Sequence, residues 1–181
     1  LERFINEPQV EMDPIVRAAL VHYQFETAHP FLDGNGRLGR LLITLMLIND
    51  GVLHSCLFYP SFQFKKNRSE YYRQLTSVRE RGTYEEWIEF FCNSLLESAK
   101  DSVGSLKNLV DLHNRSTATI TENLGRTAAN GQRLLGILEE HPIVDTAFIA
   151  AQLDIGRSTA SSLVKSFDEL GIVRPLDASR Q

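Results

Sequence analysis

Helical spacing of apolar residues, divided by start and stop signals, is the feature that most constrains how this chain can fold. Asp13 and Pro14 are typical of a helix start, because an N-cap carboxylate precedes proline at the first helical position. Apolar residues recur at helical intervals from there to Pro30, which ends the pattern. A second helix is predicted from about Asn35 to Gly51. Apolar residues surround most of its circumference, so we expect it to be central and buried.

The rest of the first hundred residues is also predicted to be mostly helical. Residues 52–64 are rich in aromatic and β-branched residues but contain a proline, which favours an irregular connection with at most a short strand. Helical spacing returns over residues 67–81. It continues over residues 83–124, where Gly104 and the stretch STATIT are weak points.

A separate unit is predicted to begin near Asn130. The segment GQRLLGILEEHP has the pattern of one helix, Asp145 is the expected N-cap of TAFIAAQL, and Ser158 is the expected N-cap of TASSLVKSFDEL. Gly171 ends the last helix before the short extended stretch IVRP. Three helices with a tight turn before the last, followed by a strand, predict a winged helix-turn-helix.

The sequence therefore predicts an all-α protein in three parts. Residues 1–100 form a helical core, residues 101–129 a helical linker, and residues 130–181 a small winged helix-turn-helix domain. The chain has 181 residues, 43% of them apolar. That is enough to bury one good core, or one core plus a small satellite domain.

Charge and composition exclude several classes of protein. The net charge of -4 gives no general attraction to polyanions. The longest apolar run, residues 41–48, is far shorter than the roughly 20 residues that span a bilayer, so no membrane partner is expected. Cys56 and Cys92 lack metal-ligand spacing and are predicted to fill the core of a reduced, cytoplasmic protein. Because the chain starts at Leu1 rather than methionine, we expect a fragment of a longer protein.

The stretch HPFLDGNGRLGR, residues 29–40, joins the two N-terminal helices and concentrates glycines and charged groups. Gly34, Asn35 and Gly36 lie at the start of the second helix, where the first backbone N–H groups have no intrahelical acceptor. Such a helix start binds anions, and glycines let the backbone approach a phosphate closely. The spacing predicts a phosphate site at this corner.

Charged residues in the same stretch indicate which phosphate compound would bind. Arg37 and Arg40 are three residues apart, so both guanidinium groups can face the helix start, which suits a nucleotide di- or triphosphate. Asp33 would repel phosphate unless a divalent cation such as Mg²⁺ lies between them. His29, at the end of the preceding helix, is the candidate general base. Together these groups predict attack by a hydroxyl group on a metal-bound phosphate.

Each of these residues also has a simpler interpretation. A histidine before proline is more often a helix-end residue than a catalyst, Asp-Gly-Asn-Gly is an ordinary turn, and both arginines can be solvated. The simpler interpretation is weakened because all of these groups converge on one helix–loop–helix corner. His22, two turns before His29, is interpreted as structural.

The same stretch resembles, at every defined position, the signature of Fic-domain proteins, His-x-Phe-x-Asp/Glu-Gly-Asn-Gly-Arg-x-x-Arg. The segments DPIVRAALVHYQFETA, LLITLMLINDGVL and NRSEYYRQL are also similar to sequences of this family, so the resemblance covers about residues 1–100. It implies a Fic-type helical core that is truncated at the N-terminus. It also implies a protein adenylyltransferase, which transfers AMP from ATP to a Ser, Thr or Tyr hydroxyl of a target protein and releases pyrophosphate.

The resemblance implies a role for most residues of the motif. His29 is the base that deprotonates the target hydroxyl, and Asp33 holds Mg²⁺ on the α- and β-phosphates. Phe31 is a buried anchor that orients the loop. Tyr72, in the segment NRSEYYRQL, is an adenine-side contact. The anion hole for the phosphates is formed by Gly34, Asn35 and Gly36. The two guanidinium groups that bind the phosphates belong to Arg37 and Arg40.

Two further elements of the family are not identified in this chain. One is a β-hairpin flap that docks the target protein, and the other is an inhibitory helix with the pattern Ser/Thr-x-x-x-Glu-Gly/Asn. The segment ATITENL departs from that pattern because Ala118 occupies the hydroxyl position, so Glu122 is not interpreted as the inhibitory glutamate. We expect both elements to precede Leu1.

The C-terminal unit resembles the winged helix-turn-helix domain at the end of many bacterial Fic proteins. Residues 131–181 include five basic and seven acidic residues, which predicts weak DNA binding at best, because neutralisation of DNA phosphates supplies most non-specific affinity. A packing or protein-contact role is favoured over DNA recognition. Arg157 and Lys165 are the candidate contacts to DNA or to a partner.

Other functions stay open at this point. The main alternatives are transfer of another nucleotide, such as UMP, and a nucleotide-sensing, DNA-binding transcriptional regulator. Kinase-like relatives replace the second loop glycine with lysine, so Gly36 argues against them, and removal of AMP would need the inhibitory glutamate. A homodimer also stays open, and the sequence does not identify the target protein.

Overall fold

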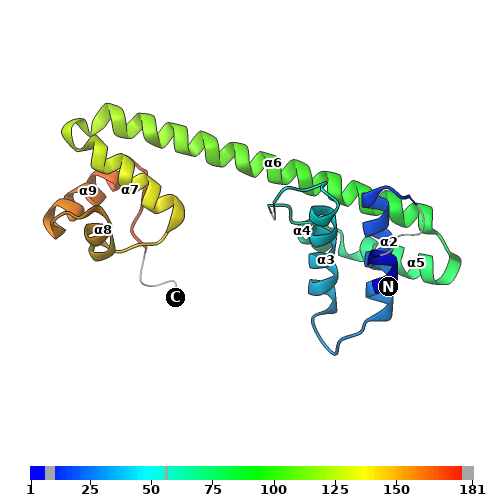
Figure 1. Cartoon of the computed structure of the whole chain (residues 1–181). Helices are drawn as coiled ribbons and strands as arrows, with labels where there is room; N and C mark the ends of the chain where they lie inside the picture. The colour runs from blue at the N-terminus through cyan, green and yellow to red at the C-terminus, as the bar shows by residue number, and fades with distance from the viewer. Residues whose placement is uncertain (7–10, 56, 177–181) are drawn as a thin grey trace. The chain divides into compact units, whose positions relative to one another are not determined.

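The computed structural model describes residues 1–6, 11–55 and 57–176, and every regular element within these ranges is helical (Figure 1). The prediction of an all-α protein is confirmed. The chain divides into two compact units, residues 1–106 (unit 1) and residues 107–181 (unit 2). No helix within the described ranges is long and apolar enough to cross a membrane.

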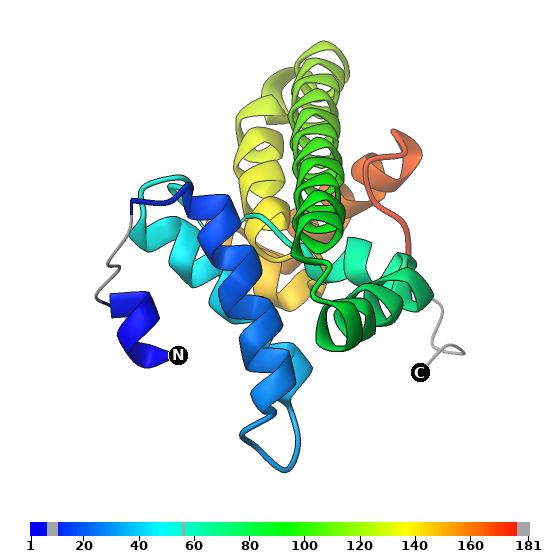
Figure 2. The same cartoon turned by 90° about the vertical axis from the view of Figure 1, so that its right-hand side faces the viewer.

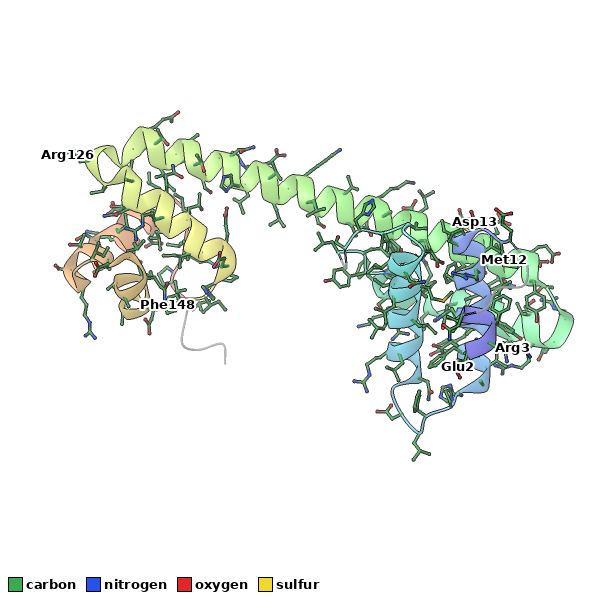
Figure 3. The ribbon with its side chains drawn as sticks, in the orientation of Figure 1. Glu2, Arg3, Met12, Asp13, Arg126 and Phe148 are labelled. Atoms are coloured by element: carbon green, nitrogen blue, oxygen red, sulfur yellow. The ribbon has the colours of Figure 1, made fainter. Side chains whose placement is uncertain are left out.

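The predicted helices of the first hundred residues form with nearly the expected bounds. Asp13 caps the second helix by accepting a hydrogen bond from Ile15 N at 2.8 Å (Figure 3), and Gly82 ends the fifth helix with a φ of +69°. The elements are α1 (Glu2–Asn6), α2 (Pro14–Ala28), α3 (Asn35–Asn49), α4 (Ser61–Lys66), α5 (Arg68–Arg81) and α6 (Tyr84–Asn123). The short helix α4, which lies in the connection after α3, was not predicted.

Aromatic side chains form the centre of the core of unit 1. Trp87 and Phe91, on α6, are both fully buried, and their ring centroids are 5.7 Å apart. Trp87 Nε1 donates a hydrogen bond to the backbone carbonyl of Ala19 at 3.0 Å, which ties α6 to α2. Cys92 is half-buried on α6, whereas Cys56 lies outside the described residues.

The helix α6 is continuous over 40 residues, so the two predicted weak points do not interrupt it (Figure 1). Gly104 has open space around it, and its cost of about 1 kcal/mol is spread over a long run of helix formers. In the STATIT stretch, the Thr121 hydroxyl donates to the Thr117 carbonyl at 2.8 Å and so is satisfied within the helix. The boundary between the two units falls inside this helix.

The composition of helix α3 had predicted burial on all sides, and this prediction is wrong. Ile43 and Leu47 are buried, but Leu38, Leu41 and Leu45 on another side of the helix are 42–52% exposed. Within unit 1, α3 packs mainly on α2, so only part of its apolar circumference is covered. A uniform apolar composition did not determine which side faces the core.

Unit 2 is a cluster of short helices around a compact apolar core. Asp145 caps its middle helix by accepting from Phe148 N at 2.7 Å, as predicted. The last helix begins at Arg157 with Gly156 as N-cap, so the prediction that Ser158 is the cap is wrong; glycine supplies the turn without a side-chain hydrogen bond. The elements are the 3₁₀ turn Gly125–Thr127, α7 (Ala128–Glu140), α8 (Thr146–Leu153) and α9 (Arg157–Glu169).

The core of unit 2 is aliphatic apart from one aromatic ring. Phe167 is fully buried, and Leu134, Leu153 and Leu163 are buried beside it. Ile120, near the end of α6, belongs to the same core, so the residues predicted as a linker contribute to packing. Residues 172–176 follow α9 without forming a strand, and the described part of this unit therefore shows the helices but no wing.

Candidate functional site

The loop of residues 29–34 joins α2 to α3, and these two helices lie side by side (Figures 1 and 2). His29 ends α2 in the left-handed conformation, with a φ of +44°, and its N–H donates to the Phe25 carbonyl at 3.0 Å. A non-glycine residue rarely adopts this conformation, but the following Pro30 prevents α2 from continuing. The His29 side chain is exposed at the helix end.

Asn35, rather than the aromatic residue of the motif, anchors the loop. Its side chain is 2% exposed, and its Oδ1 accepts from Phe31 N at 2.9 Å while its Nδ2 donates to the Phe31 carbonyl. The Phe31 ring is 51% exposed and contacts the Phe25 ring at 6.4 Å between centroids. The prediction that Phe31 is a buried anchor is wrong, because the loop is held through the Phe31 backbone.

The two glycines of the motif serve different geometric purposes. Gly34 is the N-cap of α3 with a φ of +84°, a conformation that favours glycine. Gly36 lies inside the helix, so a left-handed backbone conformation is needed only at Gly34. A Cβ added at Gly36 would lie 3.1 Å from Arg40 Nη1. Gly36 therefore provides space for the Arg40 guanidinium.

Both arginines of the motif fold back toward the start of α3, as their spacing predicted. Arg37 Nη2 lies 3.3 Å from Asp33 Oδ2, and a Cβ on Gly34 would lie 3.6 Å from the same nitrogen. Arg40 covers Gly36 from the next turn. Two cations thus lie beside backbone N–H groups that have no intrahelical acceptor. This arrangement can bind a compound with several phosphates.

Asp33 is the acidic residue that pairs with Arg37 in this cationic corner. Its side chain is almost fully exposed and its described ion pair is with Arg37. Among the described residues, no three His, Cys, Asp or Glu side chains gather in a group that could hold a metal ion. A single exposed carboxylate fits Mg²⁺ only as one ligand among phosphate oxygens and water, which is how this ion is often bound.

His22 is structural, as predicted, and supports the corner from behind. It is 1% exposed, with Nδ1 3.0 Å from the Gly39 carbonyl and Nε2 3.0 Å from the Tyr71 hydroxyl. The carbonyl can only accept, so Nδ1 donates to it and Nε2 accepts from the hydroxyl. Burial lowers the pKa of His22 to about 4, so the ring is neutral and ties α2 to α3 and α5.

Glu26 is a residue near the site that sequence reasoning missed. Its Oε1 is buried without a hydrogen-bond partner among the described residues, and burial raises the pKa of its carboxyl group. A Cβ added at Gly39 would lie 2.6 Å from this oxygen, so Glu26 lies at the contact between α2 and α3. The available signal was its spacing, three residues before His29 on the same helix.

Tyr72 lies on the exposed side of α5. Its ring is 52% exposed, and the Arg68 guanidinium carbon is 5.6 Å from the ring centre. The preceding residue, Tyr71, reaches His22 behind the loop. Tyr72 is therefore in the same unit as the motif, but no described contact joins it to residues 29–40.

The two candidate contact residues of unit 2 are both on α9. Arg157 is its first residue, and Lys165 follows about two turns later. The Lys165 ammonium lies 3.7 Å from Glu169 Oε1, and both side chains are largely exposed. The neighbouring carboxylate offsets part of the positive charge that DNA phosphates would need.

Comparison with known proteins finds similarity to one family in the N-terminal part of the chain. Residues 1–47 match the model of the Fic/DOC family. The protein adenylyltransferase fic-1 of Caenorhabditis briggsae is 34% identical over 102 residues, which are 56% of this chain and 19% of that protein. The protein adenylyltransferase Fic of Drosophila ananassae is 37% identical over 93 residues, which are 51% of this chain and 17% of that protein.

The chain spans about a fifth of the length of the curated relatives that it matches. The two relatives named above come from a nematode and an insect. The resemblance to Fic-domain proteins, which the motif at residues 29–40 indicated, is confirmed over about half of the chain.

Proposed function

We propose that this chain, whose residues 1–47 match the Fic/DOC family, takes part in protein adenylylation, transferring AMP from ATP to a Ser, Thr or Tyr hydroxyl of a target protein. The observation that carries this proposal is the corner where Arg37 and Arg40 fold over the start of α3, next to the exposed His29. In this proposal, the start of α3 binds polyphosphate and the end of α2 presents the base. In-line phosphoryl chemistry needs little else from a protein.

In the proposed reaction, the target hydroxyl oxygen attacks the α-phosphorus of ATP. His29 accepts the hydroxyl proton, the new bond joins oxygen to the α-phosphorus, and the bond from that phosphorus to the β-phosphate oxygen breaks. Pyrophosphate leaves while Arg37 and Arg40 balance its charge. Mg²⁺, if held by Asp33 and the phosphates, would further neutralise the polyphosphate.

Two parts of the corner position the nucleotide rather than react. The N–H groups at Gly34, Asn35 and Gly36 form the proposed anion hole, and the Asn35 side chain fixes the loop before them. Tyr72 is the proposed adenine contact, because an exposed aromatic ring beneath a guanidinium offers a stacking surface.

The transfer step is tested with labelled ATP, Mg²⁺ and a target protein. We expect His29→Ala to lower the transfer rate by about 10²–10⁴-fold, the usual contribution of a general base, while ATP affinity changes little. His54→Ala, at another exposed histidine of unit 1, is the matched control and should transfer normally. Equal labelling by His29→Ala and wild type would refute the assignment of the base.

Competition between nucleotides tests the identity of the transferred group. An excess of unlabelled ATP should suppress labelling, whereas an excess of UTP should not. The reverse result would favour transfer of UMP at the same corner.

For unit 2 we propose a contact with protein rather than specific binding to DNA. The support is the excess of acidic over basic residues in residues 131–181 and the Glu169 carboxylate beside Lys165. A DNA gel-shift with Arg157→Ala and Lys165→Ala tests the alternative of a nucleotide-sensing, DNA-binding regulator. A shift that depends on both residues and weakens steeply with salt would support that regulator instead.

A further inference from the structure

The two arginines of the corner are supported by acidic residues in different ways. Arg37 has a direct partner, because its guanidinium lies 3.3 Å from the Asp33 carboxylate, and both groups are in solvent. Arg40 is only partly exposed and has no ion pair within 4.0 Å among the described residues. Its guanidinium nevertheless folds back over Gly36. Something other than a direct ion pair holds it there.

Glu26 is the acidic residue whose carboxyl group interacts electrostatically with the Arg40 guanidinium. The positive charge of Arg40 lowers the pKa of the Glu26 carboxyl, partly opposing the effect of burial. The other titratable groups around this carboxyl are His22 on α2, His29 at its end, and Tyr71 on α5. Arg40 is therefore the permanent cation of this cluster.

The contact between α2 and α3 fixes the position of Glu26. Its Oε1 would lie 2.6 Å from a Cβ added at Gly39, and Gly39 directly precedes Arg40 on α3. This oxygen has no hydrogen-bond partner among the described residues. The carboxylate thus keeps its capacity to attract a cation. Attraction between charges is stronger in such a partly buried contact than in water.

We propose that Glu26 is a positioning residue whose carboxylate acts as the counter-charge that holds the Arg40 guanidinium over the start of α3, ready for the phosphates. The inference deepens the proposed function and rests on it for the identity of the ligand. Glu26 acts through Arg40 and touches neither the nucleotide nor the reacting atoms.

The sign of the effect on anion binding separates this role from a simple background charge. A carboxylate that is only near the site repels phosphate, so its removal should strengthen the binding of polyphosphate. A carboxylate that positions Arg40 should have the opposite effect, because its removal leaves the guanidinium free to move away.

The test measures the affinity of the chain for inorganic tripolyphosphate and for ATP by calorimetry. Glu26→Gln keeps the size of the side chain, and a neutral amide is easier to bury than a carboxylate, so the variant should fold. We expect its affinity for both compounds to be about tenfold weaker, in the range of measured couplings between neighbouring charged residues. Glu85→Gln, at an exposed position of α6, is the matched control and should bind like wild type.

A double-mutant cycle decides whether the effect passes through Arg40. In the Arg40→Ala background, Glu26→Gln should cause no further loss of affinity. An equal loss in both backgrounds would show a merely structural role. An unchanged or stronger affinity in Glu26→Gln alone would also overturn the proposal.

A second measurement does not depend on any ligand. The solvent exchange of the Arg40 Nε–H, followed by NMR, should be faster in Glu26→Gln than in wild type, and that of Arg37 should be unchanged. A wild-type chain that binds no tripolyphosphate would contradict the proposed function. The Arg40 exchange rate would then still decide the role of Glu26, because an unchanged rate would refute it.

Discussion

The cores of the two units differ in chemistry although both are built from helices. Unit 1 buries polar side chains among its aromatic rings, including His22, Asn35 and Gln74. In unit 2, Ser116 is the buried polar side chain among the described residues, and the rest of the core is apolar. The unit that contains the candidate site therefore uses directional hydrogen bonds, and the other relies on burial that has no preferred direction.

This difference has a physical reason. A phosphate corner requires the loop of residues 29–34 and the start of α3 to be held in one arrangement, which hydrogen bonds such as those of His22 and Asn35 enforce. Apolar packing alone tolerates small shifts between neighbours. The polar core of unit 1 thus costs desolvation but gives a defined site.

The largest effect is expected from deleting a buried ring in either core. Phe91 and Phe167 are both fully buried, so alanine at either position should lower the free energy of unfolding of its own unit by about 3–5 kcal/mol. Fluorescence of Trp87, the single tryptophan, reports unit 1. Phe91→Ala should shift its denaturant transition strongly. If Phe167→Ala shifts it equally, the two cores are not separate folding units.

The next largest effect is a pH dependence that only unit 1 should show. The pKa of folded His22 is about 4, below its ordinary value of 6.5, so the unfolded state binds the proton more readily between these values. Stability contributed by neutral His22 is complete above pH 6.5 and is lost as pH falls to about 4, by about 3 kcal/mol. Urea unfolding followed by Trp87 fluorescence at several pH values measures it.

The matched control for this pH dependence is His54→Ala, which removes an exposed histidine and should keep the wild-type profile. Amide exchange at Phe167 should change much less than the Trp87 transition over the same range. A similar acid loss in both units would contradict the comparison of the two cores.

A smaller effect tests how closely the apolar core of unit 2 is packed. A Cβ at Gly131 would lie 2.8 Å from both Ile120 and Leu124 side-chain carbons, so Gly131→Ala should destabilise unit 2 by about 1–3 kcal/mol. Gly136, on the same helix, has nothing within 4 Å, and Gly136→Ala should instead stabilise by about 0.5–1 kcal/mol. Thermal unfolding of both variants distinguishes close packing from a loose cluster.

The smallest effect concerns the anchor of the loop. Asn35→Ala removes the two hydrogen bonds to the Phe31 backbone and should cost about 1 kcal/mol, because this backbone is near solvent. The clearer measurement is hydrogen exchange of the Phe31 amide, which should lose its protection. Asn49→Ala, at an exposed end of α3, is the control. Retained protection would mean that packing, and not Asn35, holds the loop.

Most helix bounds and the chemical content of the corner could be predicted from the sequence, because both depend on neighbours in the chain. Asp13 and Asp145 cap the helices that they were expected to cap, and Gly82 ends α5. Capping involves residues only a few positions apart. The failure at Ser158 follows the same logic, since Gly156 provided an equally local alternative.

Contacts between distant residues could not be predicted in the same way. The exposed Leu41 side of α3 and the buried Asn35 depend on which face of a helix meets a neighbour, and apolar composition does not specify that face. The exposure of Phe31 has the same origin. Glu26 escaped notice because its role depends on Arg40, which packing of α2 on α3 brings near.

The sequence by itself determined the helical class, the order of most helices and the set of groups that meet at residues 29–40, because local propensity, capping and chain proximity are sufficient for these. Only the tertiary structure decided the continuity of α6, the side of α3 that is buried, and the arrangement of Glu26, His22 and Tyr71 behind the corner. The physical reason is that burial and desolvation are properties of the packed chain, and they set the charge and position of a side chain as much as its identity does.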